Sequence, residues 1–207
     1  MNGARFFRRV QDAPWYAHFL QPVLAALPAQ PGAAVLDVGT GAGKLMELGQ
    51  ALPHLHWTGA DTDAAMLAEA RQRPLLHQTP LHQLTPGDPL PFPDAQFDAV
   101  TFCSVLFLLP DPTPLLAEAW RMLRPNGRLI ALTPSGGAGT PDIMGTIGWH
   151  PSNWTFFLWR QMTAGNGRRW AQQKTLADFA RQHGAAYEKK LVFHDLAVVE
   201  WVQRANT

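Results

Sequence analysis

The stretch Val35–Gly43, VLDVGTGAG, constrains the fold of this chain more than any other segment. An apolar run of strand length is followed at once by glycines at three alternate positions, and the next residues, KLMELGQAL, have the composition of a helix. Glycines let a backbone approach a ligand closely, and the first N–H groups of a helix point toward what lies before it. The stretch therefore predicts a strand, a turn and a helix that together bind a nucleotide-like ligand.

The spacing of the glycines separates three classes of ligand. A phosphate-binding P-loop has a hydroxyl side chain after its Gly-Lys pair, and this chain has Leu45 there. A dinucleotide loop, G-x-G-x-x-G counted from Gly39, would need its third glycine at Lys44, where a long side chain hinders close helix–strand packing. The third pattern is G-x-G-x-G with an acidic residue two positions before the first glycine, here Asp37. This pattern fits best, and the dinucleotide loop remains the weaker alternative.

The third pattern resembles motif I of the class I S-adenosylmethionine-dependent methyltransferases. The ligand of that family carries no phosphate, so its loop needs neither a lysine nor a hydroxyl for phosphate binding. The resemblance implies that S-adenosylmethionine contacts this loop at Asp37, Gly39, Thr40 and Gly41. The alternative is an ordinary turn between a strand and a helix.

A second motif follows about 20 residues after the glycine loop, where an acidic side chain binds ribose hydroxyls in nucleotide folds. Trp57–Ala60 is the predicted second strand, and Asp61 follows it directly. The sequence GADTDAAMLAEAR resembles the second-strand motif of small-molecule class I methyltransferases. The resemblance implies that Asp61 binds the ribose and that Met66 contacts adenine, with Thr62 beside them. Asp63 is the predicted cap of the next helix. The alternatives are core packing for Met66 and a loop carboxylate for Asp61.

A short third strand is predicted near Leu75–His77, followed by a long, proline-rich loop over residues 78–91. The resembled family often has an aspartate and then a small residue after this strand, in contact with adenine. The corresponding positions hold Thr79 and Pro80. Thr79 keeps a hydroxyl for one hydrogen bond to the adenine, whereas Pro80 has no N–H to donate.

The motif LPFPDAQFD precedes an apolar run over Phe97–Phe102 and is typical of the small-molecule, quinone-biosynthesis type of this superfamily. A nearly continuous apolar run is expected of a central parallel strand. Ligands of open α/β sheets bind at the carboxyl ends of the strands, so Phe102 and Cys103 are candidates for contact with the methionine part of the cofactor. No histidine or acid is placed beside Cys103 by the sequence, so we interpret it as a neutral thiol rather than a nucleophile.

The rest of the chain continues the alternation of helices and strands. We predict one domain over residues 1–207 with a Rossmann-like α/β fold. Its doubly wound, mostly parallel sheet of seven strands ends in an antiparallel hairpin and follows an N-terminal helical segment over residues 1–30. Helices are predicted at 4–12, 14–27, 44–52, 113–123 and 175–183, the fifth strand at 128–133, and the hairpin strands at 187–194 and 197–204.

Residues 134–172 are predicted to form an aromatic lid after the fifth strand. A helix over Pro151–Thr163 would carry apolar residues nearly all round, and in the resembled family this segment usually covers the acceptor. The alternatives for the lid are a dimer interface or plain core packing. The predicted acceptor-binding residues are Trp149, His150, Asn153 and Trp154 in the lid, and Tyr16 and His18 in the N-terminal helices, for which packing onto the sheet is the alternative.

His150 is the candidate catalytic residue. Its side chain has a reference pKa of ~6.5 and would deprotonate an acceptor hydroxyl or amine. A purely structural hydrogen bond is the alternative for this histidine.

The composition limits the partners. The 207 residues include 17 Lys and Arg against 16 Asp and Glu, a net charge of +1 that does not suggest a basic face for nucleic acid. The single cysteine, Cys103, excludes an internal disulfide framework and a multi-cysteine metal site, and no metal is expected. The N-terminal arginines precede no apolar core of a signal peptide, and the longest apolar run, Ala99–Leu109, is too short to span a bilayer. We expect a cytoplasmic monomer or homodimer with a small-molecule acceptor and no nucleic-acid or membrane partner.

The resemblance implies transfer of a methyl group from S-adenosylmethionine to a small, partly apolar acceptor. Two other functions stay open: methylation of RNA or protein, and a non-catalytic protein of the same fold that binds a partner through its Trp-rich segment.

Overall fold

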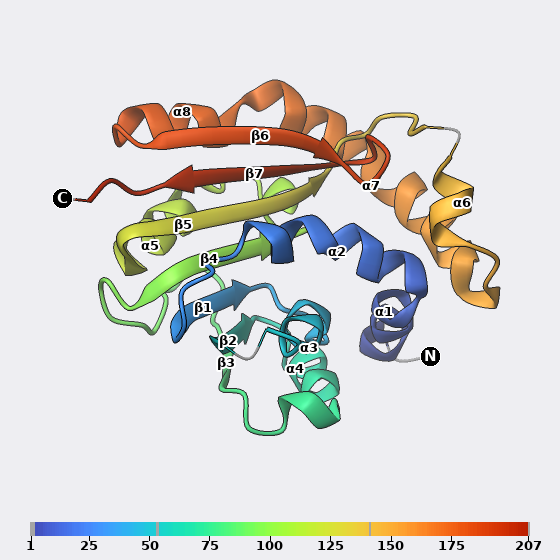
Figure 1. Cartoon of the computed structure of the whole chain (residues 1–207), viewed down its shortest axis with the longest axis horizontal. Helices are drawn as coiled ribbons and strands as arrows, with labels where there is room; N and C mark the ends of the chain where they lie inside the picture. The colour runs from blue at the N-terminus through green and yellow to red at the C-terminus, as the bar shows by residue number, and fades with distance from the viewer. Residues whose placement is uncertain (1–2, 53, 141, 207) are drawn as a thin grey trace.

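A seven-stranded sheet lies at the centre of the computed structural model, which describes residues 3–52, 54–140 and 142–206 (Figure 1). The strand order is β3-β2-β1-β4-β5-β7-β6. The strands are β1 Ala33–Val38, β2 Leu55–Asp61, β3 Leu81–Gln83, β4 Phe97–Cys103, β5 Leu123–Pro134, β6 Ala186–Val192 and β7 Ala197–Gln203.

The first five strands are parallel, and of the last two only β7 runs in the opposite direction. β1 pairs with β2 on one side and with β4 on the other, so the chain reverses its winding direction at β1. β7 runs antiparallel between β5 and β6, and β6 and β7 form the predicted terminal hairpin. The prediction of a mostly parallel Rossmann-like sheet with an antiparallel end is confirmed.

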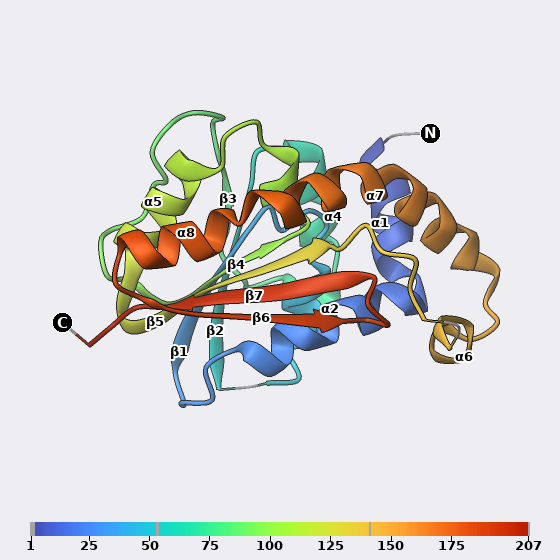
Figure 2. The same ribbon diagram turned by 90° about the horizontal axis from the view of Figure 1, so that it is seen from above.

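Helices cover both faces of the sheet (Figure 2). The side chains of α2 and α3 join one buried cluster, and those of α5 and α8 join the other. α7 contributes to both clusters, because its first half packs against α2 and its second half against the opposite face. The helices are α1 Gly3–Asp12, α2 Pro14–Ala26, α3 Lys44–Gly49, α4 Ala64–Arg71, α5 Thr113–Met122, α6 Ile143–Ile147, α7 Trp154–Gln173 and α8 Thr175–Gln182, with short 3₁₀ turns η1 Pro74–Leu76, η2 Leu106–Leu108 and η3 Pro151–Asn153.

Two predicted elements are wrong in position. Residues 75–77, predicted as the third strand, lie in η1 and the residue after it, and the third strand is Leu81–Gln83. Leu75 is exposed to solvent, although its apolar side chain is typical of a buried strand residue. The helix predicted over Pro151–Thr163 begins at Trp154 after a 3₁₀ turn and continues to Gln173, because its second half packs on β5.

The N-terminal helices are attached to the segment after β5 through Trp15. Pro14 occupies the first turn of α2, as predicted, and Trp15 is completely buried. Its Nε1–H donates a hydrogen bond of 2.8 Å to Thr155 Oγ1 in α7. The same ring packs edge-on against Phe156 and beside Trp159. Trp15 therefore joins two segments that are 140 residues apart in the chain.

Replacing Thr155 by Val tests this attachment. The variant keeps the shape of the side chain but leaves the buried Trp15 N–H without its acceptor, which should lower the free energy of unfolding by about 1–3 kcal/mol. Thr155→Ser is the matched control because it keeps the hydroxyl. Urea unfolding of the three proteins measures the difference, and equal stabilities of the Val and Ser variants would contradict this role of the hydrogen bond.

Candidate functional site

A cavity of about 610 Å³ opens at the carboxyl ends of the parallel strands. Val38 and Gly39 line it after β1, and Asp61 and Thr62 line it at the end of β2. The segment after β3, from Leu84 to Leu90, and residues between β4 and α5 complete the wall. The cavity thus lies at the point where the winding direction of the sheet reverses, which is where open α/β sheets bind ligands.

Asp61 joins the glycine loop to the start of α4. Its Oδ2 accepts a hydrogen bond of 2.7 Å from the backbone N–H of Gly41, and its Oδ1 accepts one of 2.9 Å from the N–H of Asp63. Each carboxylate oxygen has a second lone pair, so both oxygens keep the capacity to accept a further hydrogen bond from a ligand. Asp63 in turn caps α4 by accepting from the N–H groups of Ala65 and Met66, which confirms the predicted cap.

Asp37 is a buried carboxylate at the end of β1. It is only 2% exposed, and its strand partner Thr101 in β4 donates a 2.7 Å hydrogen bond to its Oδ1. Burial raises the pKa of Asp37 to about 6, partly offset by the hydrogen bond from Thr101. Among the described residues, no Lys, Arg or His forms an ion pair with it. An unpaired buried carboxylate is costly and suits a cationic ligand group.

The glycine loop is closely covered on both sides. Gly39 and Gly41 have φ angles of 73° and 57°, which favour glycine. A Cβ at Gly39 would collide with the side chain of Val105, and a Cβ at Gly41 would lie 2.8 Å from Nε2 of Gln11. Both glycines are therefore required by conformation, and Gly39 also by space, whereas the flexible Gln11 side chain could move away from a Cβ at Gly41.

Several buried polar atoms beside this loop have no partner among the described residues. They are Thr40 Oγ1 in the loop itself, Gln11 Oε1 in α1 and Ser104 Oγ directly after β4. Ser104 also has a φ of 60°, an uncommon backbone conformation for a residue with a side chain. Unpaired buried polar atoms of this kind point to a polar ligand that would complete their hydrogen bonds.

Tyr16 and Cys103 lie on the same side of the loop. Burial and then the neighbouring Cys103 and Asp37 raise the pKa of the Tyr16 hydroxyl, although Gln11 forms a hydrogen bond with it. Burial and the nearby Asp37 raise the pKa of the Cys103 thiol well above its ordinary value. Both side chains are therefore neutral at physiological pH, in line with the interpretation of Cys103 as a thiol rather than a nucleophile.

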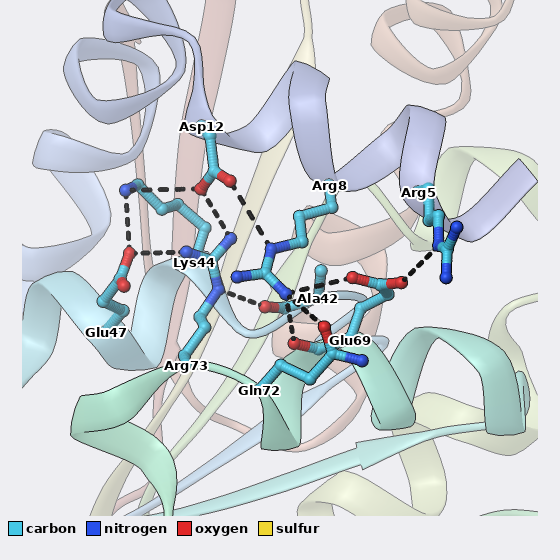
Figure 3. Close-up of polar contacts among 9 residues, drawn as sticks. All are labelled: Arg5, Arg8, Asp12, Ala42, Lys44, Glu47, Glu69, Gln72 and Arg73. Atoms are coloured by element: carbon cyan, nitrogen blue, oxygen red, sulfur yellow. Dashed lines mark hydrogen bonds and ion pairs between the residues drawn. The ribbon is translucent and has the colours of Figure 1, made fainter.

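Helix α1 is held across the glycine loop by Arg73, which follows α4 (Figure 3). The Arg73 side chain is almost fully buried, and its Nε donates a 2.5 Å hydrogen bond to the carbonyl of Ala42. Its Nη1 lies 2.7 Å from Glu47 Oε2 in α3, and its Nη2 lies 2.8 Å from Asp12 Oδ1 in α1. Lys44 approaches the same Asp12 oxygen at 3.8 Å.

A second contact fixes the outer part of α1 (Figure 3). Arg8 Nη1 donates to Glu69 Oε2 in α4 at 3.0 Å and to Gln72 Oε1 at 3.1 Å, and Arg5 lies 3.7 Å from the same Glu69 carboxylate. Together with Arg73, these contacts hold Gln11 over Gly41.

The cavity wall is acidic. The described residues that line it include Asp61, Asp88, Asp111 and Glu118, and none of them is Lys, Arg or His. Hydrogen bonds from Thr113 lower the pKa of Asp111, and the hydrogen bond from Arg121 lowers that of Glu118. Both therefore stay ionised at neutral pH, which disfavours an anionic ligand.

Of the predicted cofactor residues, Gly39, Asp61 and Thr62 line the cavity. Asp37, Thr40, Gly41 and Cys103 lie in the adjoining glycine loop or at the ends of β1 and β4, and the other three contribute to neither. Met66 lies on the first turn of α4 but does not line the cavity, and Phe102 is completely buried in the core. Thr79 precedes β3, and its hydroxyl accepts from Gln50 at 3.5 Å, so the proposed adenine contact depended on a wrongly placed strand. At the carboxyl end of β3, Leu84 and Thr85 line the cavity instead.

The predicted acceptor residues do not gather around the cavity. Tyr16 alone is buried beside the loop, and His18 is exposed on α2. Trp149 is fully exposed, and the exposed His150 accepts from the N–H of Ser152 at the start of η3.

The other two lid residues are also separate from the cavity. Trp154 is exposed next to Phe6, and Asn153 is buried and donates to the carbonyls of Ile147 and Gly148. His150 is exposed and does not line the cavity.

Sequence reasoning missed Gln11, Val105 and Ser104. Gln11 comes from a helix that precedes β1 and reaches the loop only through the ion pairs of α1. Val105 and Ser104 directly follow the predicted fourth strand, so their position at its carboxyl end was a signal that pointed to them.

Comparison with known proteins finds similarity to methyltransferases. The profile of a methyltransferase domain family matches residues 36–131. The chain is 43% identical over 124 residues to a demethylmenaquinone methyltransferase of Deinococcus radiodurans, which covers 58% of this chain and 49% of the relative. It is 36% identical over 124 residues to a ubiquinone/menaquinone biosynthesis C-methyltransferase of Desulfotalea psychrophila, which covers 59% of this chain and 48% of the relative. The chain thus spans about half the length of these curated relatives.

The fold as a whole is also shared. A solved structure of an S-adenosylmethionine-dependent methyltransferase from Aquifex aeolicus superposes with a TM-score of 0.62 and covers 98% of this chain and 99% of that one. Its sequence identity is 19%, so this likeness concerns the fold alone.

Replacing Asp37 by Asn tests whether the buried Asp37 carboxylate lacks a compensating positive charge in the folded protein. Because the folded-state pKa of about 6 exceeds the ordinary 3.8, the folded protein binds this proton more tightly than the unfolded chain. The free energy of unfolding should therefore fall as the pH rises from 3.8 to about 6. The Asn variant should lack this decline and be more stable at pH 7, by at most about 3 kcal/mol. Thermal unfolding across this pH range measures both effects, and a variant that is less stable than the wild type at pH 7 would contradict the assignment.

Proposed function

We propose that this chain is a class I S-adenosylmethionine-dependent methyltransferase that transfers the methyl group of S-adenosylmethionine to a small, partly apolar acceptor. The cofactor would bind at the carboxyl ends of β1, β2 and β4.

The observation that carries this proposal is the uncompensated negative charge of the site. Asp37 is buried without a cationic partner among the described residues, and Asp61 lies across the same glycine loop. The described residues of the cavity wall add further carboxylates and include no Lys, Arg or His. S-adenosylmethionine carries a sulfonium and an ammonium group, which such a site stabilises. A dinucleotide carries a pyrophosphate, which the same carboxylates would repel.

Each part of the site has a complementary part in the ligand. The two oxygens of Asp61 would accept hydrogen bonds from the ribose diol in addition to those from Gly41 and Asp63. The apolar wall formed by Leu84, Leu90 and Val105 would contact adenine.

The methionine portion would meet the polar side of the loop. The unpaired oxygens of Thr40 and Gln11 are buried there and would accept hydrogen bonds from its ammonium group. The residues present therefore fit the cofactor, including the groups that the structure leaves without partners.

When bound, S-adenosylmethionine would supply an activated methyl group carried on a sulfonium. The protein's task is then to align the acceptor and exclude water, and proximity of this kind can lower a barrier by about 7–11 kcal/mol. Tyr16 and Cys103 stay protonated beside the loop, so neither is suited to act as a base. The acceptor would therefore have to bring its own nucleophilic atom in reactive form.

The surroundings favour an acceptor with apolar parts. Leu109, Pro114 and Leu115 add apolar surface to the cavity wall on the side of α5. The relatives named above are quinone-biosynthesis methyltransferases, whose names agree with a small, ring-containing acceptor.

Calorimetric titration with S-adenosylmethionine and S-adenosylhomocysteine tests the cofactor site. We expect the wild type to bind both, and Asp61→Ala to lose about 1.5–3 kcal/mol of binding free energy through the lost charge-assisted hydrogen bonds. Asp61→Asn keeps one acceptor oxygen and should lose less. Asp178→Asn, at an exposed carboxylate of α8 that pairs with Arg181 and does not line the cavity, is the control and should bind like the wild type.

Thermal unfolding of each variant shows whether a loss of affinity merely reflects a loosened loop. A wild type that binds neither compound would overturn the proposal and favour a non-catalytic protein of this fold.

A further inference from the structure

Five large apolar side chains are exposed at one end of the molecule. Phe7 is 47% exposed, Met144 40%, Trp149 100%, Trp154 55% and Phe157 52%. We call this set the aromatic end patch. Exposed Trp and Phe side chains in such density are uncommon on a protein surface and indicate an interaction site.

The members of the aromatic end patch come from distant parts of the chain. Phe7 belongs to α1, Met144 to α6, and Trp154 and Phe157 to α7. Ring contacts connect them, because Phe6 lies 5.9 Å from Phe7 and 6.0 Å from Trp154 between ring centroids. Figures 1 and 2 both place α1, α6 and the first half of α7 at the same end of the molecule. The carboxyl ends of β4 and β5 point toward this end (Figure 1).

The helices that carry the patch have an excess of basic residues. α1, α6 and the first half of α7, residues 154–163, contain Arg5, Arg8, Arg9 and Arg160 against one acidic residue, Asp12. The rest of the chain has 13 Lys and Arg residues against 15 Asp and Glu residues and is therefore slightly acidic, although the net charge of the whole is +1. Arg5 and Arg8 share Glu69 of α4.

We propose that the aromatic end patch docks on an anionic phospholipid bilayer. Aromatic side chains with a polar edge are favoured at the boundary between headgroups and acyl chains, and arginines are attracted by the negative surface potential of anionic lipids. A second copy of this chain is a poorer partner, because a symmetric contact would bring two basic surfaces face to face. Attachment through this patch is peripheral, since no described helix has the length and apolarity that a membrane span requires.

This docking revises the expectation of no membrane partner. That expectation rested on the lack of an apolar run long enough to span a bilayer. A surface patch assembled from three helices does not form such a run in the sequence. The patch also lies at the end toward which the catalytic edge of the sheet faces. If the proposed function holds, the docked protein would receive an apolar acceptor directly from the bilayer.

Vesicle co-sedimentation of the full chain tests this inference. We expect binding to vesicles of phosphatidylcholine mixed with phosphatidylglycerol, weaker binding to phosphatidylcholine alone, and a loss of binding with added salt. Trp149→Ser should lower the partition coefficient by about tenfold, the effect of losing roughly one interfacial aromatic side chain. Because Trp149 is fully exposed, its replacement does not disturb the core. Leu75→Ser, at a 60% exposed apolar residue outside the patch, is the matched control and should bind like the wild type.

Three results would overturn the inference. The first is an unchanged partition coefficient of Trp149→Ser. The second is a wild-type dimer in light scattering that becomes a monomer in Trp149→Ser without any vesicle binding, which would assign the patch to a second copy. The third is preferential binding of a single-stranded RNA oligonucleotide over anionic vesicles.

Titration with S-adenosylhomocysteine keeps this test separate from the proposed function. Trp149→Ser should bind the compound as the wild type does, because Trp149 is fully exposed and does not line the cavity. If the wild type bound vesicles but not S-adenosylhomocysteine, the membrane-docking inference would stand and only the proposed function would be refuted.

Discussion

The pairing of β1 with both β2 and β4 is the constraint on which the rest of this structure depends. It places the carboxyl ends of three parallel strands side by side, so that the glycine loop, Asp61 and the residues after β4 face one another. The register pairs Asp37 with Thr101, and the loop N–H groups of Gly39 and Thr40 return to the carbonyl of Ala60. A shift of either neighbour by one residue would turn these side chains to the opposite face of the sheet.

The site retains a charge that the fold alone does not need. An apolar residue at Asp37 would pack the same space without the cost of burying a carboxylate, and the raised pKa expresses that cost. A site that carries such a cost is expected where binding compensates it. The ion pairs of Arg73 and Arg8 then bring α1 over the loop, so that Gln11 lies next to the same charge.

The distribution of charge divides the molecule into two functional regions. The cavity wall is acidic and suits a small cationic ligand, whereas the segments that carry the aromatic end patch are basic and suit an anionic surface. Both regions are built around α1, since its polar side faces the glycine loop and Phe6 on its other side contacts Trp154. The near-zero net charge conceals this separation, because the two regions cancel in the sum.

The sequence by itself determined the alternation of strands and helices, the glycine loop, the acidic residue after β2 and the cap of α4, because each of these depends on neighbours within a few residues. It did not determine the third strand, since an exposed Leu in a 3₁₀ turn and a short strand have similar local composition. Only the tertiary structure decided that Gln11 lies over Gly41, that Phe102 belongs to the core and that Trp149 faces solvent. These positions depend on contacts between segments far apart in the chain, which local periodicity does not encode.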